Sequence, residues 1–134
     1  MPAVLLDSSF LIELEREIEG GQAGPAVRWL QQNRRRAARP LLVSAISVAE
    51  FLEGFDDSSR GLAFISHFVP QGLGFKQAIK CAELQRRARA FGRRLGENDA
   101  WQVAVAECAA AAIVGRDRPA FERLGKRYEQ LERA

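Results

Sequence analysis

The sequence is poor in the residues on which disulfide scaffolds and soft metal sites depend. Only two cysteines, Cys81 and Cys108, occur among 134 residues, and they lack the spacing of metal ligands. Both fall in apolar stretches expected to be helical, so we interpret them as core thiols in a reducing compartment. His67 is the only histidine, and a structural or surface role is its natural interpretation.

Long apolar runs are also absent. No segment approaches the roughly 20 apolar residues that span a bilayer. The first apolar stretch, residues 3–6, stops at Asp7 and is too short for the apolar core of a secretory signal. We therefore expect a soluble cytoplasmic protein. Because repeats, linkers and low-complexity segments are missing as well, residues 1–134 are expected to form one domain.

The chain does contain enough apolar material for a core, and its positive charge is unevenly distributed. Apolar residues make up 47% of the sequence, which excludes an intrinsically disordered protein. The net charge is only +3, but arginines gather in two groups, which are Arg34, Arg35, Arg36 and Arg39, and Arg86, Arg87, Arg89, Arg93 and Arg94. A guanidinium matches phosphate oxygens. Each group could contact a nucleic acid or could simply be a solvated helix face.

Short apolar segments alternate with longer helical patterns. Strands are expected at 3–6, 41–45 and 112–115, with a further short one at 68–70. Helices are expected at 10–19, 25–36, 47–53, 58–67, 75–95, 99–111 and 121–131. Ser8 or Ser9 would cap the first helix and Ser47 the third. The helix at 75–95 would bury one stripe, formed by Cys81, Leu84, Ala88, Phe91 and Leu95.

Helical connections of this length join parallel strands, so the predicted class is α/β with helices on both faces of a small sheet. In such folds ligands bind beyond the carboxyl ends of the strands. Asp7 directly follows the first strand, and Asp117 comes shortly after the last one. Glu50 lies early in the helix after the second strand. Asp99 begins the helix that leads into the last strand and reaches the same edge only if that helix is suitably oriented.

Each of these acids also has a structural explanation. Asp7 could cap a helix, and Glu50 has capping-box spacing from Ser47. Asp99 could favour the positive end of its helix, and Asp117 could form a turn before a proline. The functional interpretation rests on all four acids occupying equivalent topological positions. Four carboxylates in one notch would raise one another's pKa values unless a cation neutralised them. Oxygen ligands favour a hard divalent ion, so we expect Mg²⁺ or Mn²⁺.

Four segments together resemble PIN-domain nucleases, in particular the VapC toxins of toxin–antitoxin pairs. They read VLLDSSFLIEL, VSAISVAEFLEG, GENDAWQVAVAEC and AIVGRDRPAFERLG, in the family's order and over nearly the whole chain. The resemblance implies a three-layer α/β/α sandwich with a central parallel sheet. It places the family's acidic residues on Asp7, Glu50, Asp99 and Asp117, and it implies that Ser8 helps to orient the site.

Two positions depart from the family's pattern. Gly115 stands where the last strand of many relatives has a threonine, which removes a hydroxyl from the site. Ser9 stands where many relatives have asparagine. The resemblance further implies a small VapB-like antitoxin as partner and a homodimer. Phe10, Leu11, Leu14 and Trp29 could serve either interface or the core.

The function expected from these observations is hydrolysis of RNA phosphodiester bonds by a metal-dependent endoribonuclease. The four acids would hold one or two divalent ions, and a metal-activated water would attack the phosphate. The arginine groups would hold RNA, single-stranded or looped rather than duplex. An alternative is a catalytically silent PIN-like module that binds RNA or protein, favoured by Gly115. A phosphatase is disfavoured because Ser9 occupies the place of its second aspartate.

Overall fold

The computed structural model describes residues 2–116 and 127–131, and its centre is a five-stranded, fully parallel sheet. The strands lie in the order β3-β2-β1-β4-β5, so the first strand of the chain is in the middle. Their bounds are β1 Val4–Leu6, β2 Leu41–Ser44, β3 Val69–Gln71, β4 Ala112–Gly115 and β5 Tyr128–Gln130. The strands expected from the sequence at 3–6, 41–45, 68–70 and 112–115 are all present to within a residue at each end.

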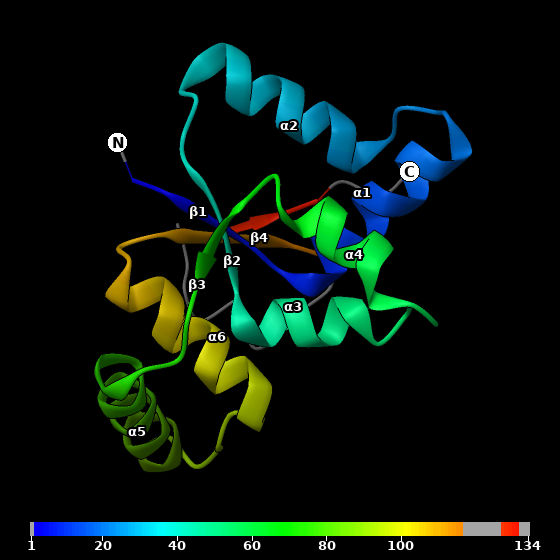
Figure 1. Cartoon of the computed structure of the whole chain (residues 1–134). Helices are drawn as coiled ribbons and strands as arrows, with labels where there is room; N and C mark the ends of the chain where they lie inside the picture. Colours follow the sequence, from blue (N-terminus) through cyan, green and yellow to red (C-terminus); the bar gives the residue numbers. More distant parts are fainter. Residues whose placement is uncertain (1, 117–126, 132–134) are drawn as a thin grey trace.

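Helices cover both faces of the sheet, which gives the three layers that the resemblance implied (Figure 1). Their bounds are α1 Ser8–Gly20, α2 Pro25–Arg36, α3 Ala45–Leu52, α4 Ser58–Ile65, α5 Phe75–Ala90 and α6 Glu97–Cys108. The helices α1 to α4 pack on one face. On the other face α6 lies against the strands, and α5 packs mainly on α6. The predicted α/β/α sandwich is confirmed.

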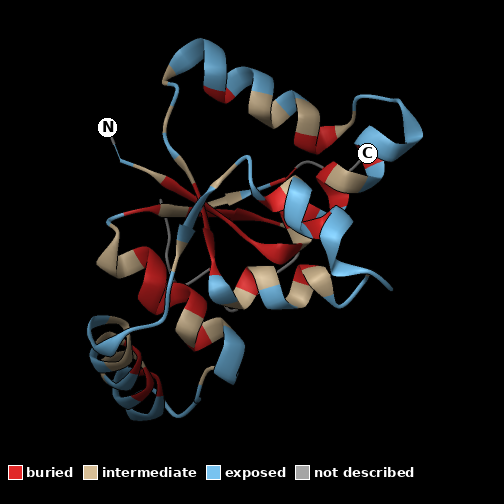
Figure 2. Cartoon of the chain, in the orientation of Figure 1, coloured by how far each residue is buried: buried red, intermediate tan, exposed pale blue. Residues whose placement is uncertain are grey.

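The alternation of side chains along each strand divides the core between the two faces. Val4 and Leu6 point toward α1 to α4, whereas Leu5 between them points toward α6. Because both faces are covered, the strands read as continuous apolar runs instead of alternating ones. Figure 2 shows the buried residues concentrated in these strands and on the facing sides of the helices.

The last part of the chain departs from the sequence-based expectation. A helix was expected at 121–131, but residues 128–130 form the edge strand β5, which pairs in parallel with β4. Its short sequence, YEQ, has no apolar run that would indicate a strand. The pairing is set instead by neighbouring backbone, since the Leu131 amide also donates to the carbonyl of Gly115 at 2.9 Å.

Two helix starts also differ from expectation, for a common reason. The caps are Asp7, which directly follows β1, and Ser44, the last residue of β2, rather than the later serines. Ser44 Oγ accepts a hydrogen bond from the amide of Ser47 at 3.0 Å. Neither connection contains a loop, so the residue at the junction between strand and helix caps the helix.

The helix expected at 75–95 ends five residues early, at Ala90. Gly92 adopts a left-handed backbone with φ of 82°, which glycine tolerates without strain. Phe91 is consequently 88% exposed and does not belong to the buried stripe that was expected. Cys81 and Ala88 of that stripe are buried as expected, and both cysteines are free thiols.

The apolar residues of the early helices belong to the core. Phe10, Leu11 and Leu14 are at most 2% exposed. Trp29 packs edge-on against Phe10, with ring centroids 5.3 Å apart. Of the two roles that the sequence left open, the interface role is therefore wrong for the three α1 residues. In the part of the chain with assigned structure, no helix is long and apolar enough to cross a membrane.

Candidate functional site

The carboxyl ends of β1, β2 and β4 meet at one edge of the sheet. Asp7 follows β1 directly, and its amide donates to the carbonyl of Val114 in β4 at 2.9 Å. Ser44 is the last residue of β2, and Gly115 the last of β4. Chain segments far apart in sequence thus present Asp7, Ser44 and Gly115 along the edge where the sequence predicted a site.

Asp7 is 2% exposed and is held by the first turn of α1. Its Oδ2 accepts hydrogen bonds from the amide of Ser9 at 3.3 Å and from Ser9 Oγ at 2.7 Å. The structural explanation of Asp7 as a helix cap is therefore correct. It does not exclude a second role, because a capping carboxylate at a strand end still faces the edge of the sheet.

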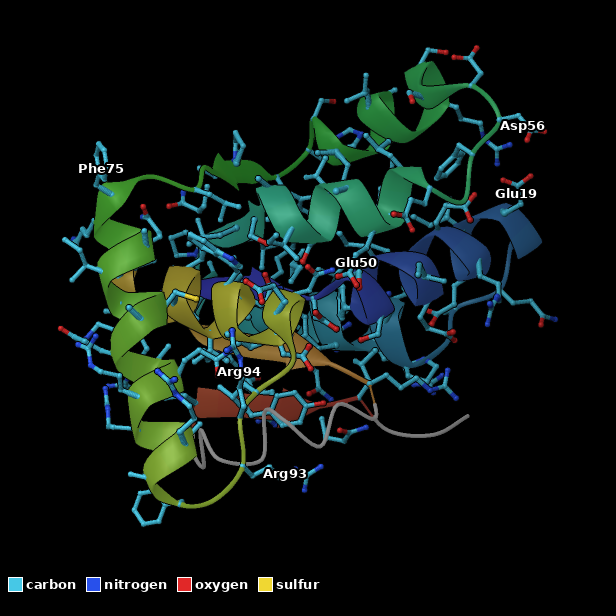
Figure 3. All side chains as sticks on the ribbon, turned by 90° about the horizontal axis from the view of Figure 1, so that it is seen from below. Glu19, Glu50, Asp56, Phe75, Arg93 and Arg94 are labelled. Atoms are coloured by element: carbon cyan, nitrogen blue, oxygen red, sulfur yellow. The ribbon has the colours of Figure 1, made fainter. Side chains whose placement is uncertain are left out.

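Glu50 is brought next to the Asp7 segment by α3. Its Oε1 accepts a hydrogen bond from the buried Ser8 hydroxyl at 3.1 Å. It lies in the second turn of α3, not the first, and Ser44 rather than Ser47 caps this helix, so the capping-box explanation for Glu50 is wrong. In Figure 3 Glu50 lies near the middle of the molecule, whereas Glu19 lies at one end.

Asp99 is half-buried in the first turn of α6, which begins two residues earlier than expected, at Glu97. The orientation of α6 is fixed one turn further on, where Gln102 Nε2 lies 3.4 Å from Asp7 Oδ1. The helix therefore runs past the strand ends with Asp99 on the turn that precedes this contact. The sequence placed Asp99 at this edge only if its helix ran in this direction, and the helix does so.

Gln102 is a site residue that the sequence analysis did not single out. It is 2% exposed, its Nε2 donates to Ser47 Oγ at 2.7 Å, and its Oε1 accepts from the hydroxyl of Ser44. One side chain thus connects β2, α3 and α6 beneath Asp7. The sequence contained one indication of this role, because Gln102 is polar within the otherwise apolar stretch of α6. A buried amide requires hydrogen-bond partners.

The described carboxylates do not by themselves complete a metal site. Across residues 2–116 and 127–131, no three acidic, histidine or cysteine side chains form a group able to hold an ion. Asp117, the fourth predicted acid, lies outside the described residues. The side chains that the sequence assigned to this site, Asp7, Glu50 and Asp99, and the serine hydroxyls that contact Asp7 and Glu50 offer only oxygen donors. Oxygen donors fit a hard divalent ion such as Mg²⁺ or Mn²⁺.

The two arginine groups have different surroundings. Arg39 forms a two-point ion pair with Glu129, with Nη1–Oε2 at 2.6 Å and Nη2–Oε1 at 3.1 Å, and lies over the Trp29 ring. Burial raises the pKa of Glu129. The hydrogen bonds from Arg39 and Trp29 and the charge of Arg39 together lower it by more, so the net shift of this pKa is downward. Arg39 is thus a structural residue, not a surface contact for RNA.

The exposed arginines separate by position. Arg34, Arg35 and Arg36 end α2, and the chain then enters the start of β2, at the sheet edge opposite the candidate site. Arg86, Arg89 and Arg94 instead line a shallow cavity of about 330 Å³ together with Glu97 and Trp101, at the start of α6. This second group therefore lies beside α6, the helix that carries Asp99.

The fold has close counterparts among solved structures. The VapBC2 complex of Rickettsia felis bound to a promoter DNA fragment superposes with a TM-score of 0.76 at 16% identity, covering 97% of this chain and 99% of that one. FitAcB of Neisseria gonorrhoeae gives 0.72 at 20% identity, covering 89% and 91%. VapBC-1 of nontypeable Haemophilus influenzae gives 0.75 at 18%, covering 96% and 97%. At such identities the likeness establishes the fold.

Sequence comparison identifies the family directly. The family model for the PIN domain matches residues 4–127 of this chain. No curated protein matches the chain significantly. The match includes β1, the whole of the described site edge and the segment that contains Asp117. Since it covers nearly the entire sequence, this protein belongs to the PIN-domain family, as the four sequence segments had indicated.

Proposed function

We propose that this protein is a metal-dependent endoribonuclease and the toxin of a VapBC-type pair. The observation that supports the proposal is the hydrogen bond from Ser8 to Glu50, which joins the Asp7 turn to α3 at the strand ends of a PIN fold. Gln102 brings the helix that bears Asp99 to the same edge. The chain segments that carry Asp7, Glu50 and Asp99 thus approach the edge where an α/β sheet binds its ligands, which supports the proposal.

In this proposal Asp7 and Asp99 ligate the ion, while Glu50 and Asp117 position water or a second ion. When bound, Mg²⁺ or Mn²⁺ supplies an activated water and offsets charge that develops on the phosphate oxygens. Ser8 holds the Glu50 carboxylate in place through its hydroxyl. Gln102 and Ser9 fix the orientation of Asp7 from opposite sides of its carboxylate, at Oδ1 and Oδ2 respectively.

The substrate of the proposed reaction is single-stranded or looped RNA that approaches across the end of α5. Arg86, Arg89 and Arg94 provide positive charge beside the start of α6, and Trp101 lies in the same cavity. Guanidinium groups pair with phosphates, and an indole offers a surface on which an unpaired base stacks.

The proposed protein partner is a small VapB-like antitoxin, since the structural neighbours include complexes named VapBC. A largely apolar cavity of about 640 Å³ between α1, α2 and α4 suits an apolar segment of such a partner, with Leu14, Ile18, Leu30 and Phe64 among its lining residues. We expect the chain to co-purify with the product of an adjacent small gene. Failure of the two to associate when co-expressed would contradict this part of the proposal.

A homodimer is proposed on different grounds. The edge strand β3 and the start of α5 expose Val69, Leu73, Phe75 and Ile79, with Phe75 91% exposed. Large apolar side chains exposed on successive segments of the chain favour a protein interface. Light scattering of the purified chain should give twice the 14.9 kDa mass of one copy. A mass of one copy at micromolar concentration would argue against the dimer.

The catalytic proposal is tested by Asp7→Asn. Asparagine still caps a helix, so the fold should persist, while the loss of a charged oxygen should lower Mg²⁺-dependent RNA cleavage at least about 100-fold. Asp57→Asn is a matched control, because Asp57 caps α4 through the amide of Ser59 at 2.9 Å. Cleavage is measured on a labelled RNA and folding by circular dichroism.

The same experiment separates the alternative function. Cleavage by Asp7→Asn at the unsubstituted rate would refute the assignment of Asp7. If the unsubstituted protein binds RNA but neither cleaves it nor binds Mn²⁺, the protein is a catalytically silent binding module instead. This alternative is the one that Gly115 favoured in the sequence, because glycine brings no hydroxyl to the site.

A further inference from the structure

The Ser9 hydroxyl lies in the space beside Gly115 into which a side chain at position 115 would extend. Ser9 Oγ donates to Asp7 Oδ2 at 2.7 Å and accepts from the amide of Arg116 at 2.8 Å. Ser9 belongs to the first turn of α1, whereas Arg116 follows β4 directly. A single hydroxyl therefore joins the first acidic residue to the backbone at the end of the last central strand.

The space around Gly115 is filled by this arrangement. A Cβ added to Gly115 would lie 3.0 Å from Ser9 Oγ, 3.0 Å from Asp7 Cβ and 3.2 Å from Asp7 Oδ2. All three distances are shorter than ordinary van der Waals contacts. Gly115 has no left-handed backbone that would require glycine, in contrast to Gly21 and Gly92. Glycine is favoured at this position because the Ser9 hydroxyl and the Asp7 side chain occupy the room of a side chain.

We propose that Ser9 is a positioning residue for Asp7, and that its hydroxyl occupies the place that a side chain at position 115 would otherwise take. The inference rests on the proposed function, because positioning matters only if Asp7 ligates the ion. Ser9 and Gly115 then form a coupled pair, because the hydroxyl on α1 fits against the Asp7 carboxylate while position 115 in β4 has no side chain.

The geometry gives this hydroxyl two effects on the site. Its donated hydrogen bond selects one rotation of the Asp7 carboxylate, so that less freedom is lost when an ion binds. Its accepted hydrogen bond fixes the amide of Arg116, the residue immediately before Asp117 in the sequence. Removing the hydroxyl should weaken ion binding. The fold should stay intact, because Ser9 is only half-buried.

The test compares Ser9→Ala with two double variants. Ser9→Ala should bind Mn²⁺ about 10-fold more weakly, the lower end of the effect of removing a group that orients a metal ligand. Adding Gly115→Thr supplies a hydroxyl beside Asp7 and should recover part of the affinity, since its Cβ still lies close to Asp7 Cβ. Adding Gly115→Ala is the matched control, because it places the same Cβ beside Asp7 without a hydroxyl and should recover none. Affinity is measured by electron paramagnetic resonance of Mn²⁺, and thermal unfolding verifies each fold.

Ser9→Thr keeps the hydroxyl and should keep the affinity, so it supplies the comparison if Ser9→Ala unfolds. The proposal is overturned if Ser9→Ala binds Mn²⁺ as tightly as the unsubstituted protein, or if both double variants recover affinity equally. Asp7→Asn distinguishes this failure from that of the proposed function. Undiminished Mn²⁺ binding by Asp7→Asn refutes the ion site. Weakened binding by Asp7→Asn together with undiminished binding by Ser9→Ala refutes only the role of Ser9.

Discussion

At the scale of single residues, Glu17 has a structural role that its polarity conceals. It is 9% exposed, and its carboxylate accepts hydrogen bonds from the amides of Gly24, Ala26 and Val27 at 2.7, 3.0 and 2.9 Å. These amides belong to the start of α2, which has no side-chain cap of its own. Glu17 thus caps from α1 the helix that packs beside it.

We expect Glu17→Gln to lower the free energy of unfolding by about 1–3 kcal/mol at neutral pH, since charge-assisted hydrogen bonds are lost. Burial raises the pKa of Glu17, but the three amides outweigh it and lower the pKa below its ordinary value of 4.5. The stabilisation is therefore complete above about pH 4.5 and is lost as the pH falls through the lowered pKa.

Urea unfolding of both proteins between pH 3 and 7 measures this effect. The difference between them should shrink on acidification. Glu19→Gln on the same helix is the control, because Glu19 is exposed and pairs only with Arg60 among the described residues, a surface contact of little energetic value. A difference that does not depend on pH would contradict the charge-based explanation.

At the scale of secondary structure elements, α6 connects the core with the site edge. Its apolar residues Val103 and Ala106 pack under the sheet, while Gln102 reaches the hydroxyls of Ser44 and Ser47. Both contacts lie on one helix, so its packing and the geometry around Asp7 are coupled. The first turn of α6, which contains Asp99, is positioned by the same packing.

Gln102→Leu should lower the free energy of unfolding by about 1–3 kcal/mol, because the two buried hydroxyls lose a hydrogen-bond partner while helix propensity and side-chain size change little. It should also weaken Mn²⁺ binding through Asp7. Gln32→Leu on the exposed side of α2 is the control and should change neither. Denaturant unfolding and Mn²⁺ titration measure the two effects, and an unaltered midpoint for Gln102→Leu would show that the buried network contributes nothing.

At the scale of the whole molecule, the exposed arginines lie in two separate places, the end of α2 and the side of α5 beside α6. The end of α2 bears Arg34 and Arg35, remote from the strand ends, whereas Arg86 and Arg89 lie beside the start of α6. Both pairs are exposed. Net charge alone would make them equivalent for RNA, and only their location distinguishes them.

Replacing Arg86 and Arg89 with glutamine should weaken the binding of single-stranded RNA and reduce the slope of log affinity against log salt concentration. The slope falls by about 0.7 for each phosphate that the protein no longer neutralises. The same change at Arg34 and Arg35 is the matched control and should have little effect. Fluorescence anisotropy in EDTA measures binding without cleavage. An equal weakening of binding for the two pairs would indicate nonspecific attraction and refute an RNA path along α5.

Much of the fold could be predicted because its determinants are local. Apolar runs of three or four residues, followed by helical periodicity, located four of the five strands and the parallel arrangement. Helix starts were less well predicted, since Asp7 and Ser44 cap their helices directly at the end of a strand. Propensity alone does not separate such a residue from the serines that follow it.

By itself the sequence determined the α/β class, the PIN-domain family and which acids follow strands, because each of these depends on patterns between neighbouring residues. Only the tertiary structure decided that Ser9 contacts Arg116 across 107 positions, that Arg39 pairs with Glu129, and that residues 128–130 form a strand. These features arise from backbones that packing brings together. Composition and periodicity record what a segment buries, but not which distant segment lies beside it.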